Sequence, residues 1–131
     1  MLIDTSMWIE FFRKGGSFAL KQRVATLIEL DQAAFTCPIH FEILSGAHDS
    51  EIGLVKETFA LIERHPFRPE FWDQAADLDR RLRKKGVTIP RDDLFIAVAA
   101  HRLSLTLVCK DKHFDLIREK TGFALQIEQH A

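Results

Sequence analysis

The stretch LIDTSMWI at residues 2–9 decides the fold, because it joins a short apolar strand to a helix through one acidic residue. Leu2 and Ile3 are typical of a short buried strand, and a helix follows over residues 6–12 before a Gly-Gly pair ends it. Asp4 therefore stands directly after a strand. Ligands of open parallel α/β sheets bind beyond the carboxyl ends of the strands, so Asp4 is a candidate functional residue.

The same alternation of strand and helix continues to the end of the chain. Apolar residues at helical spacing predict helices over residues 18–30, 52–63, 70–85, 92–103 and 111–119, and a further helix runs from Pro38 to about Ala47. Further strands are predicted at residues 33–37, 105–109 and 124–127. Phe67 lies in a short segment bounded by prolines, which we expect to be an extended connection. This order predicts an α/β fold with a mostly parallel central sheet flanked by helices.

The composition is that of an ordinary soluble globule, with 47% hydrophobic and 28% charged residues. The chain has 131 residues, the size of one domain, and shows no repeat or linker, so we expect a single domain over residues 1–131. A net charge of −1 argues against a protein that coats nucleic acid by bulk charge, while leaving room for a local basic patch.

The two cysteines, Cys37 and Cys109, form no close pair, so they predict neither a zinc ligand set nor a disulfide framework. This cysteine usage fits a reducing cytoplasm. No positively charged segment followed by a long apolar run stands at the N-terminus, so we expect no signal peptide. The longest apolar stretches are too short to span a bilayer, which predicts a cytoplasmic protein without a membrane partner.

Acidic residues from distant parts of the chain are predicted at one end of the sheet. Asp111 follows the strand over residues 105–109, and Asp92 and Asp93 open the helix that leads into it. Each alone has an ordinary alternative, because Asp at a helix start is a common N-cap that suits the helix dipole. Glu42 lies inside the apolar run HFEIL, where a carboxylate needs a partner or a metal unless it belongs to a solvated stripe.

Several carboxylates that face one point repel each other, and a hard divalent cation such as Mg²⁺ removes that penalty. The sequence has no His and Cys cluster typical of zinc or copper, no glycine-rich phosphate loop and no Gly-x-Ser-x-Gly turn. A phosphatase like the haloacid dehalogenases would need an Asp where Ser6 stands. A carboxylate-held magnesium site is therefore the favoured chemistry.

Four segments in order resemble the successive motifs of the PIN-domain family. They are LIDTSMWI at residues 2–9, PIHFEILSG at 38–46, DLFIAVA at 93–99 and LVCKDKHF at 107–114. Their order, their spacing and the total length match, and the resemblance covers essentially the whole chain. Within that family the compact size most resembles the VapC toxins of toxin–antitoxin pairs.

This resemblance implies an endoribonuclease that depends on Mg²⁺ or Mn²⁺, an RNA substrate, a VapB-like antitoxin that blocks the site, and a homodimer. It implies that Asp4, Glu42, Asp93 and Asp111 are the catalytic acids, with Asp4 and Asp93 as metal ligands. It also implies that Ser6 supplies a supporting hydroxyl.

The sequence departs from the family at the fourth motif. Many members carry a further Asp near the position of His113, and Thr or Ser where Cys109 stands. Whether Asp115 or Asp92 joins the site stays open. From the residues themselves, we expect His113 to be structural or on the surface.

Basic residues crowd the end of one predicted helix: Arg80, Arg81, Arg83, Lys84 and Lys85. They fit an RNA-binding track, because phosphate contacts dominate affinity for nucleic acids. They fit equally a solvated face that complements the negative end of the helix dipole.

Two alternatives to the toxin remain: a PIN-like nuclease of RNA processing or repair without an antitoxin, and a non-catalytic PIN-like binding module. The acids of the clearest motifs are all present, which disfavours the second. For the toxin, we expect a partner whose basic side chain enters among Asp4, Glu42 and Asp93. Its apolar segment would lie over Trp8 and Phe12.

Overall fold

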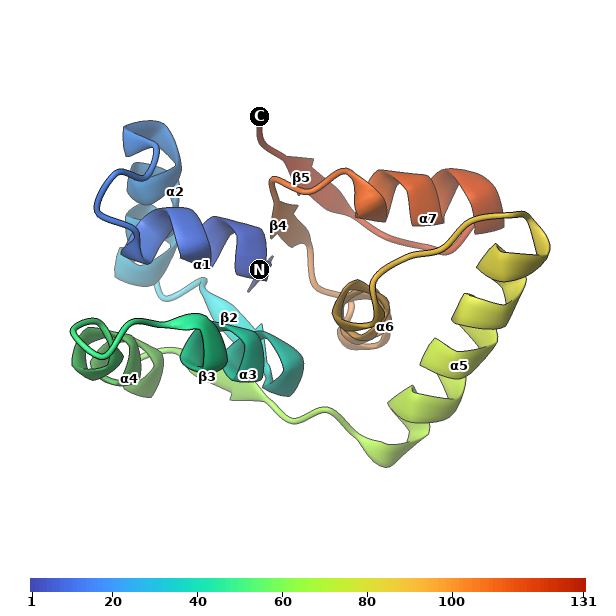
Figure 1. Cartoon of the computed structure of the whole chain (residues 1–131), viewed down its shortest axis with the longest axis horizontal. Coiled ribbons are helices and arrows are strands. Elements are labelled where there is room, and N and C mark those ends of the chain that lie inside the picture. Colours follow the sequence, from blue (N-terminus) through green and yellow to red (C-terminus); the bar gives the residue numbers. More distant parts are fainter.

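Five short strands and seven helices make up the protein, described over residues 1–131 by a computed structural model (Figure 1). The strands are β1 (Leu2–Ile3), β2 (Ala34–Thr36), β3 (Glu63–His65), β4 (Leu107–Cys109) and β5 (Ile127–Gln129). The helices are α1 (Thr5–Phe12), α2 (Phe18–Glu29), α3 (Cys37–Gly46), α4 (Ile52–Ala60), α5 (Pro69–Lys84), α6 (Arg91–Leu103) and α7 (His113–Thr121). The expected α/β fold is confirmed, and every strand pair is parallel.

The strand order β3-β2-β1-β4-β5 places a reversal of the chain's path between β1 and β4. The chain moves outward from β1 to β3 and then returns through α5 and α6 to β4. Leu2 lies opposite Leu107 and Ile3 opposite Val108, so β1 and β4 end at the same level. The Asp4 N–H then donates to the Val108 carbonyl at 2.9 Å. Open α/β sheets bind ligands at such a reversal.

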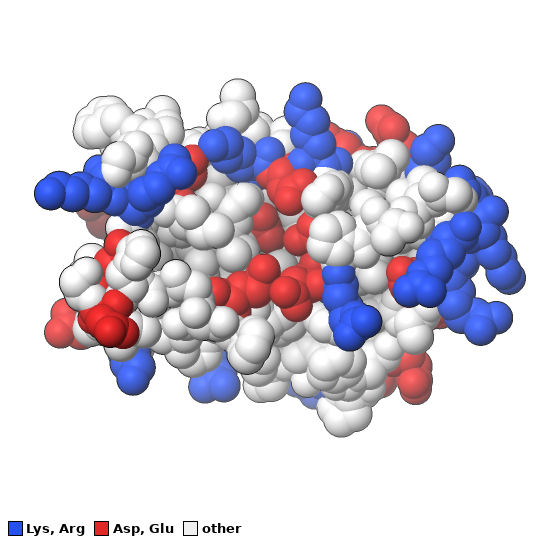
Figure 2. Space-filling view, in the orientation of Figure 1, with Lys and Arg blue, Asp and Glu red and all other residues white.

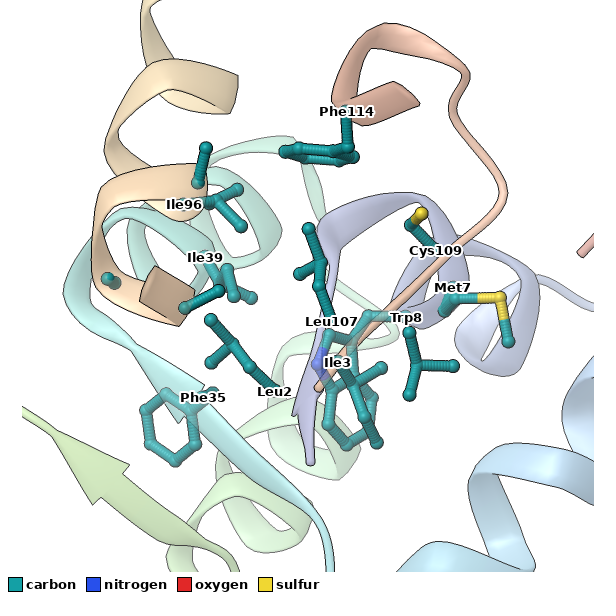
Figure 3. Packing of buried hydrophobic residues seen from close by; sticks show 14 of the residues in the cluster. Leu2, Ile3, Met7, Trp8, Phe35, Ile39, Ile96, Leu107, Cys109 and Phe114 are labelled. Atoms are coloured by element: carbon teal, nitrogen blue, oxygen red, sulfur yellow. The ribbon is translucent and has the colours of Figure 1, made fainter. Parts of the chain in front are cut away.

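The central strands are apolar throughout because helices cover the sheet on both faces. Leu2, Ile3 and Leu107 have no exposed surface, and side chains from β1 and β4 meet those of several helices in one core (Figure 3). Trp8 is fully buried, and its ring lies edge-on to Phe59 at 5.0 Å between centroids. Because Trp8 is enclosed, it is not available to a partner, and the expectation that a partner segment lies over Trp8 is wrong.

Helix α6 fixes one wall of the sheet's carboxyl end. It contacts α3, α5 and α7, and buried alanines such as Ala97 and Ala100 let these neighbours approach closely. Because α6 leads into β4, it runs back along the sheet, and its first turn lies at the carboxyl ends of the strands. Asp92 and Asp93 occupy that first turn.

Strand β3 was not predicted from the sequence. Residues 63–65 were assigned to the end of a helix and the start of a connection, but they pair with β2 at the edge of the sheet. Their side chains are polar and mostly exposed, so they lack the apolar pattern that marks a strand. The last strand also begins three residues later than expected, at Ile127. No helix combines the length and the apolar character needed to cross a lipid bilayer.

The turn after α1 depends on a glycine. A Cβ added to Gly16 would lie 2.0 Å from the backbone oxygen of Glu10, whereas one added to Gly15 would meet nothing within 4 Å. We predict that Gly16→Ala lowers the free energy of unfolding by about 1–3 kcal/mol, the usual cost of forced overpacking. Gly15→Ala is the matched control and should change it far less. Urea denaturation of both variants measures the difference, and equal stabilities would contradict the close approach.

Candidate metal centre

Asp4 is a buried carboxylate with one unpartnered oxygen. It is 2% exposed at the end of β1, and its Oδ2 accepts hydrogen bonds from the Ser6 N–H at 3.1 Å and the Ser6 hydroxyl at 2.5 Å. This confirms Asp4 as the N-cap of α1 and gives Ser6 the supporting contact that the sequence predicted. Asp4 Oδ1 is buried and has no hydrogen-bond partner. One oxygen therefore caps the helix and the other remains free for a ligand.

Asp93 and Asp111 converge on the same place from α6 and from the loop after β4. His113, the first residue of α7, joins them: its Nδ1 lies 2.6 Å from Asp93 Oδ2 and 3.0 Å from Asp111 Oδ1. Asp111 Oδ1 also accepts a hydrogen bond from the His113 N–H at 2.9 Å. The expectation that His113 is structural or on the surface is compatible with these contacts and stays a prediction. A half-buried imidazole stands between two of the predicted acids.

Glu42 reaches the site from α3. The Thr5 hydroxyl donates to Glu42 Oε1 at 2.7 Å, so the residue after Asp4 holds the predicted fourth acid. Burial is the main cause that raises the pKa of Glu42, and the charges of Asp92, Asp4 and Asp93 add to it. The Thr5 hydrogen bond lowers the pKa, and the net result is a value of about 7. The segment HFEIL thus carries a half-buried carboxylate whose pKa lies near neutral pH.

The acids raise one another's pKa values. Burial raises the pKa of Asp4 to about 6, and the charges of Asp93 and Asp111 contribute to this rise. Burial also raises the pKa of Asp93, with a further contribution from Asp111. Figure 2 shows acidic side chains gathered in the hollowed middle of one face, with Lys and Arg placed around them. The structure therefore brings together all four predicted acids.

The donor set fits a hard divalent cation. A buried carboxylate oxygen without a hydrogen bond, such as Asp4 Oδ1, costs free energy unless a ligand satisfies it. Ligand atoms of Asp93, Asp111 and His113 all lie within 4.8 Å of one another. Cys109 lies buried at the end of β4, and burial raises the pKa of its thiol to about 12, so it stays protonated and offers no thiolate.

The two acids left open by the sequence have different positions. Asp115 pairs with Arg118 at 2.9 Å on α7. Asp92 sits beside Asp93 in the first turn of α6, and its charge acts on Glu42. Both residues contribute to the electrostatics near the site, because the charge of Asp115 acts on Cys109 together with those of Asp4, Asp111 and Asp93. Whether either acid joins the site stays a prediction.

An ion pair behind the site holds the loop that carries Asp111. Glu10 is 4% exposed, and its carboxylate accepts from Lys110 Nζ at 2.8 Å, from Arg13 and from the Ser17 N–H. These contacts, the Lys110 hydrogen bond first, lower the pKa of Glu10 to about 2. The Lys110 N–H in turn donates to Ser6 Oγ at 3.1 Å. Lys110 is therefore fixed through both its side chain and its backbone.

Sequence reasoning missed Glu10 and His113 for different reasons. Glu10 stands among apolar residues of the first motif, yet nothing local indicates its partner Lys110, which lies 100 residues away. His113 follows Asp111 by two residues, but its contact with Asp93 depends on the packing of α6 against α7, which the sequence spacing does not reveal.

The basic residues at the end of α5 are partly occupied within the fold. The Arg81 guanidinium donates to the Thr121 carbonyl at 2.7 Å, and the Lys85 ammonium donates to the Lys120 carbonyl. These contacts join α5 to the carboxyl end of α7. Arg83 pairs with Asp79 at 3.0 Å. Arg80 and Lys84 are exposed, so an RNA-binding role for this cluster stays a prediction.

A cavity of about 240 Å³ opens beside the acids, between α1, α3 and α4. Its apolar lining comes from Ile9, Phe12, Ile43 and Val55, and Glu42 forms part of its wall. Ile9, on the wall of this cavity, remains 49% exposed. The metal centre thus borders an open apolar groove.

Comparisons with known proteins place this geometry in a family. The family model described as "PIN domain" matches residues 1–120. The chain is 34% identical over 131 residues to "VapC ribonuclease Mb1587" of Mycobacterium bovis, with 93% of this chain and 94% of that protein covered. The same figures hold for "Ribonuclease VapC11" of Mycobacterium tuberculosis.

Solved structures share the fold at lower sequence identity. A structure of FitAB bound to an IR36 DNA fragment matches with a TM-score of 0.77 and 17% identity, covering 99% of this chain and 96% of that chain. VapBC2 from Rickettsia felis, bound to a promoter DNA fragment, matches with a TM-score of 0.73 and 18% identity, covering 98% and 96%. With the family model and the close relatives spanning nearly its whole length, the chain belongs to the PIN-domain family.

Proposed function

We propose that this protein is a metal-dependent endoribonuclease and the toxin of a type II toxin–antitoxin pair. One observation carries the proposal: Glu42, Asp93 and Asp111, from three other segments, lie close enough for their charges to interact with that of Asp4, whose buried Oδ1 has no hydrogen-bond partner. The relatives at 34% identity are named VapC ribonucleases, which supports RNA as the substrate. A non-catalytic binding module would have no need to keep these repelling carboxylates together.

The cofactor would be Mg²⁺ or Mn²⁺, held by Asp4 and Asp93 with Asp111 beside them. When bound, such an ion lowers the pKa of a water and stabilises charge on the phosphate. Asp4 is fixed by the Ser6 hydrogen bonds and Asp111 by the His113 N–H, so both carboxylates are oriented in advance. Because these carboxylates are already oriented, little conformational entropy would be lost when the ion and the substrate are positioned.

Glu42 is the best candidate for the residue that takes a proton from the attacking water. Thr5 holds one of its oxygens, and its pKa of about 7 lies where a general base works best near neutral pH. The Glu10–Lys110 ion pair and the Lys110–Ser6 hydrogen bond hold the loop that carries Asp111 against the start of α1, beside Asp4. Arg80 and Lys84 are exposed for contact with the RNA backbone.

The antitoxin would occupy the groove between α1, α3 and α4. FitAB and VapBC structures are toxin–antitoxin complexes of the same fold, which supports such a partner. An apolar segment over Ile9 and Phe12 could extend an Arg toward Glu42, because a guanidinium can bond two carboxylate oxygens at once. The expected contact with Trp8 is excluded by its burial. Phe41 and Trp72 expose apolar surface that a second copy of the chain would cover in a homodimer.

The nuclease proposal is tested at Asp93. We predict that Asp93→Asn lowers cleavage of a fluorogenic RNA in Mg²⁺ or Mn²⁺ by at least about 100-fold, because it removes a charged ligand. Asp73→Asn, at an exposed position on α5, is the matched control and should retain activity. Purification of both variants in parallel excludes a contaminating nuclease. Full activity of Asp93→Asn would reject the assignment.

The repulsion in the site predicts an unusual pH dependence of stability. Asp4 has a pKa of about 6 in the folded protein and an ordinary value of 3.8, so the folded state binds its proton at higher pH. With chelator present, Asp4 should therefore destabilise the protein fully above pH 7 and progressively less as the pH falls toward 4. Glu42, with a pKa of about 7, acts in the same direction.

We predict that Asp4→Asn raises the stability of the metal-free protein at pH 7.5, by at most about 3 kcal/mol, and that this gain shrinks toward pH 4. Thermal melts across this pH range measure it. Asp77→Asn, at an exposed position on α5, is the control that should give no pH-dependent gain. A gain that is constant with pH would mean that charge at Asp4 is not its cause.

The antitoxin proposal is tested in the groove. We predict that Ile9→Arg abolishes binding of the antitoxin, because the complex would bury an unpaired charge against the partner's apolar segment. RNA cleavage should stay within about twofold of the parent, because Ile9 is neither a proposed metal ligand nor the proposed base. Leu30→Arg, at a 60% exposed position outside the groove, is the control and should leave both unchanged. Calorimetry gives the affinity. Unaltered affinity in Ile9→Arg would show that the partner binds elsewhere.

A further inference from the structure

We propose that His113 is a direct ligand of the cation, and that its nitrogen makes the site select a transition-metal dication such as Mn²⁺ over Mg²⁺. This inference rests on the metal-dependent function proposed above and specifies the ion and one further ligand of that site. The residues concerned lie on the loop after β4 and at the start of α6 and α7.

The spacing of the ligand atoms fits one ion. Two neighbouring ligands of an octahedral cation with bonds of about 2.1 Å lie about 3 Å apart. His113 Nδ1 lies 2.6 Å from Asp93 Oδ2 and 3.0 Å from Asp111 Oδ1, and all three ligand atoms fit within 4.8 Å. Small movements of these side chains are enough to admit an ion among them. Without an ion, Nδ1 carries a proton that it donates to the Asp93 carboxylate, and a bound cation would replace that proton. Nε2 makes no hydrogen bond in the protein, so it can keep the other ring proton.

An independent observation indicates that a ligand belongs here. Asp4 Oδ1 is buried without a hydrogen-bond partner, and Asp4 is close enough to Asp93 and Asp111 for their charges to raise its pKa. An acidic cluster on an exposed surface would leave its oxygens to water. Here the free oxygen is enclosed, and a cation among these side chains would satisfy it.

The fold holds the imidazole in place. Asp111 Oδ1 accepts the backbone N–H of His113, which ties the first residue of α7 to the loop. That loop is anchored on its other side by Lys110, through Glu10 and Ser6. The His113 side chain is 40% exposed, which leaves room for water ligands on the open side. The backbone of His113 is therefore fixed before any ion binds.

The nitrogen decides which ion is preferred. Mg²⁺ takes oxygen ligands at strict octahedral geometry and gains little from an imidazole. First-row transition dications accept nitrogen and oxygen ligands together, so a site with one His and two or three carboxylates favours them. An Asp in place of His113 would instead give an all-oxygen site. Identity at this one position should therefore set the ratio of the two affinities.

The experiment compares His113→Ala and His113→Asp with the parent protein, and uses His101→Ala, at the opposite end of α6, as the control histidine. Continuous-wave EPR titration gives the Mn²⁺ affinity, and competition gives that of Mg²⁺. Pulsed EPR of the Mn²⁺ complex detects modulation from a directly bound ¹⁴N nucleus. Circular dichroism checks that each variant folds.

We expect ¹⁴N modulation in the parent and in His101→Ala, and its loss in both His113 variants. The ratio of Mn²⁺ to Mg²⁺ affinity should fall at least about 10-fold in His113→Ala. His113→Asp should recover Mg²⁺ binding in preference to Mn²⁺ binding. Absence of ¹⁴N modulation in the parent protein, or an unchanged affinity ratio in His113→Ala, would overturn the proposal and leave His113 as a residue that only orients Asp93.

Two results separate this inference from the nuclease proposal. Nitrogen-coupled Mn²⁺ bound by a protein that cleaves no RNA would uphold the ligand and reject the nuclease. Metal-dependent RNA cleavage without a nitrogen signal would uphold the nuclease and reject the ligand. Neither measurement depends on the other, because the EPR readout requires no substrate.

Discussion

The parallel pairing of β1 with β4 is the constraint on which the rest of the structure depends. These strands are two and three residues long, and their register brings residues from opposite ends of the chain to the same level of the sheet. The chain reverses its path between them, so no helix connection covers the space beyond their ends. The candidate catalytic side chains are placed relative to this space by the strand ends, by the first turns of α1, α6 and α7, and by α3, which carries Glu42.

Two buried acids, Asp4 and Glu10, have pKa values shifted in opposite directions. Glu10 is satisfied by a lysine, an arginine and a backbone N–H, so its pKa falls to about 2 and it remains charged. Asp4 is equally enclosed but keeps a free oxygen, so its pKa rises to about 6. The first arrangement contributes a fixed salt bridge that holds the loop. The second keeps carboxylates that repel one another close together, and a bound cation can neutralise that repulsion. Raised pKa values of this kind are typical of functional carboxylates.

The fold was largely predictable because its main elements follow clear local patterns. Pro38 opens α3 as expected, and the apolar spacing along α5 and α6 gives their extents to within a residue or two. Strand β3 was not predictable, because Glu63, Arg64 and His65 take an extended form only through pairing with β2. The periodicity of apolar residues cannot reveal a polar strand that forms only because it pairs with another strand.

The same limit applies to the candidate site. Asp4, Asp93 and Asp111 were identified because each follows a strand or opens a helix, positions that local pattern reveals. The contact of His113 with Asp93 spans 20 residues and depends on how α6 and α7 pack, which no spacing rule in the sequence gives. The sequence therefore identified the acids, and tertiary packing supplied the nitrogen that stands between them.

The outer strands have a consequence for how this protein can meet other chains. β3 and β5 form the two edges of the sheet, each is three residues long, and each carries a charged residue. On β5, Glu128 is paired with Arg23 of α2 at 2.8 Å. Short, charged edges discourage the addition of a foreign strand, the commonest route by which exposed sheets aggregate. Other chains are therefore expected to bind this protein through its helices. A second copy of the chain gains little by adding a strand to either edge of the sheet.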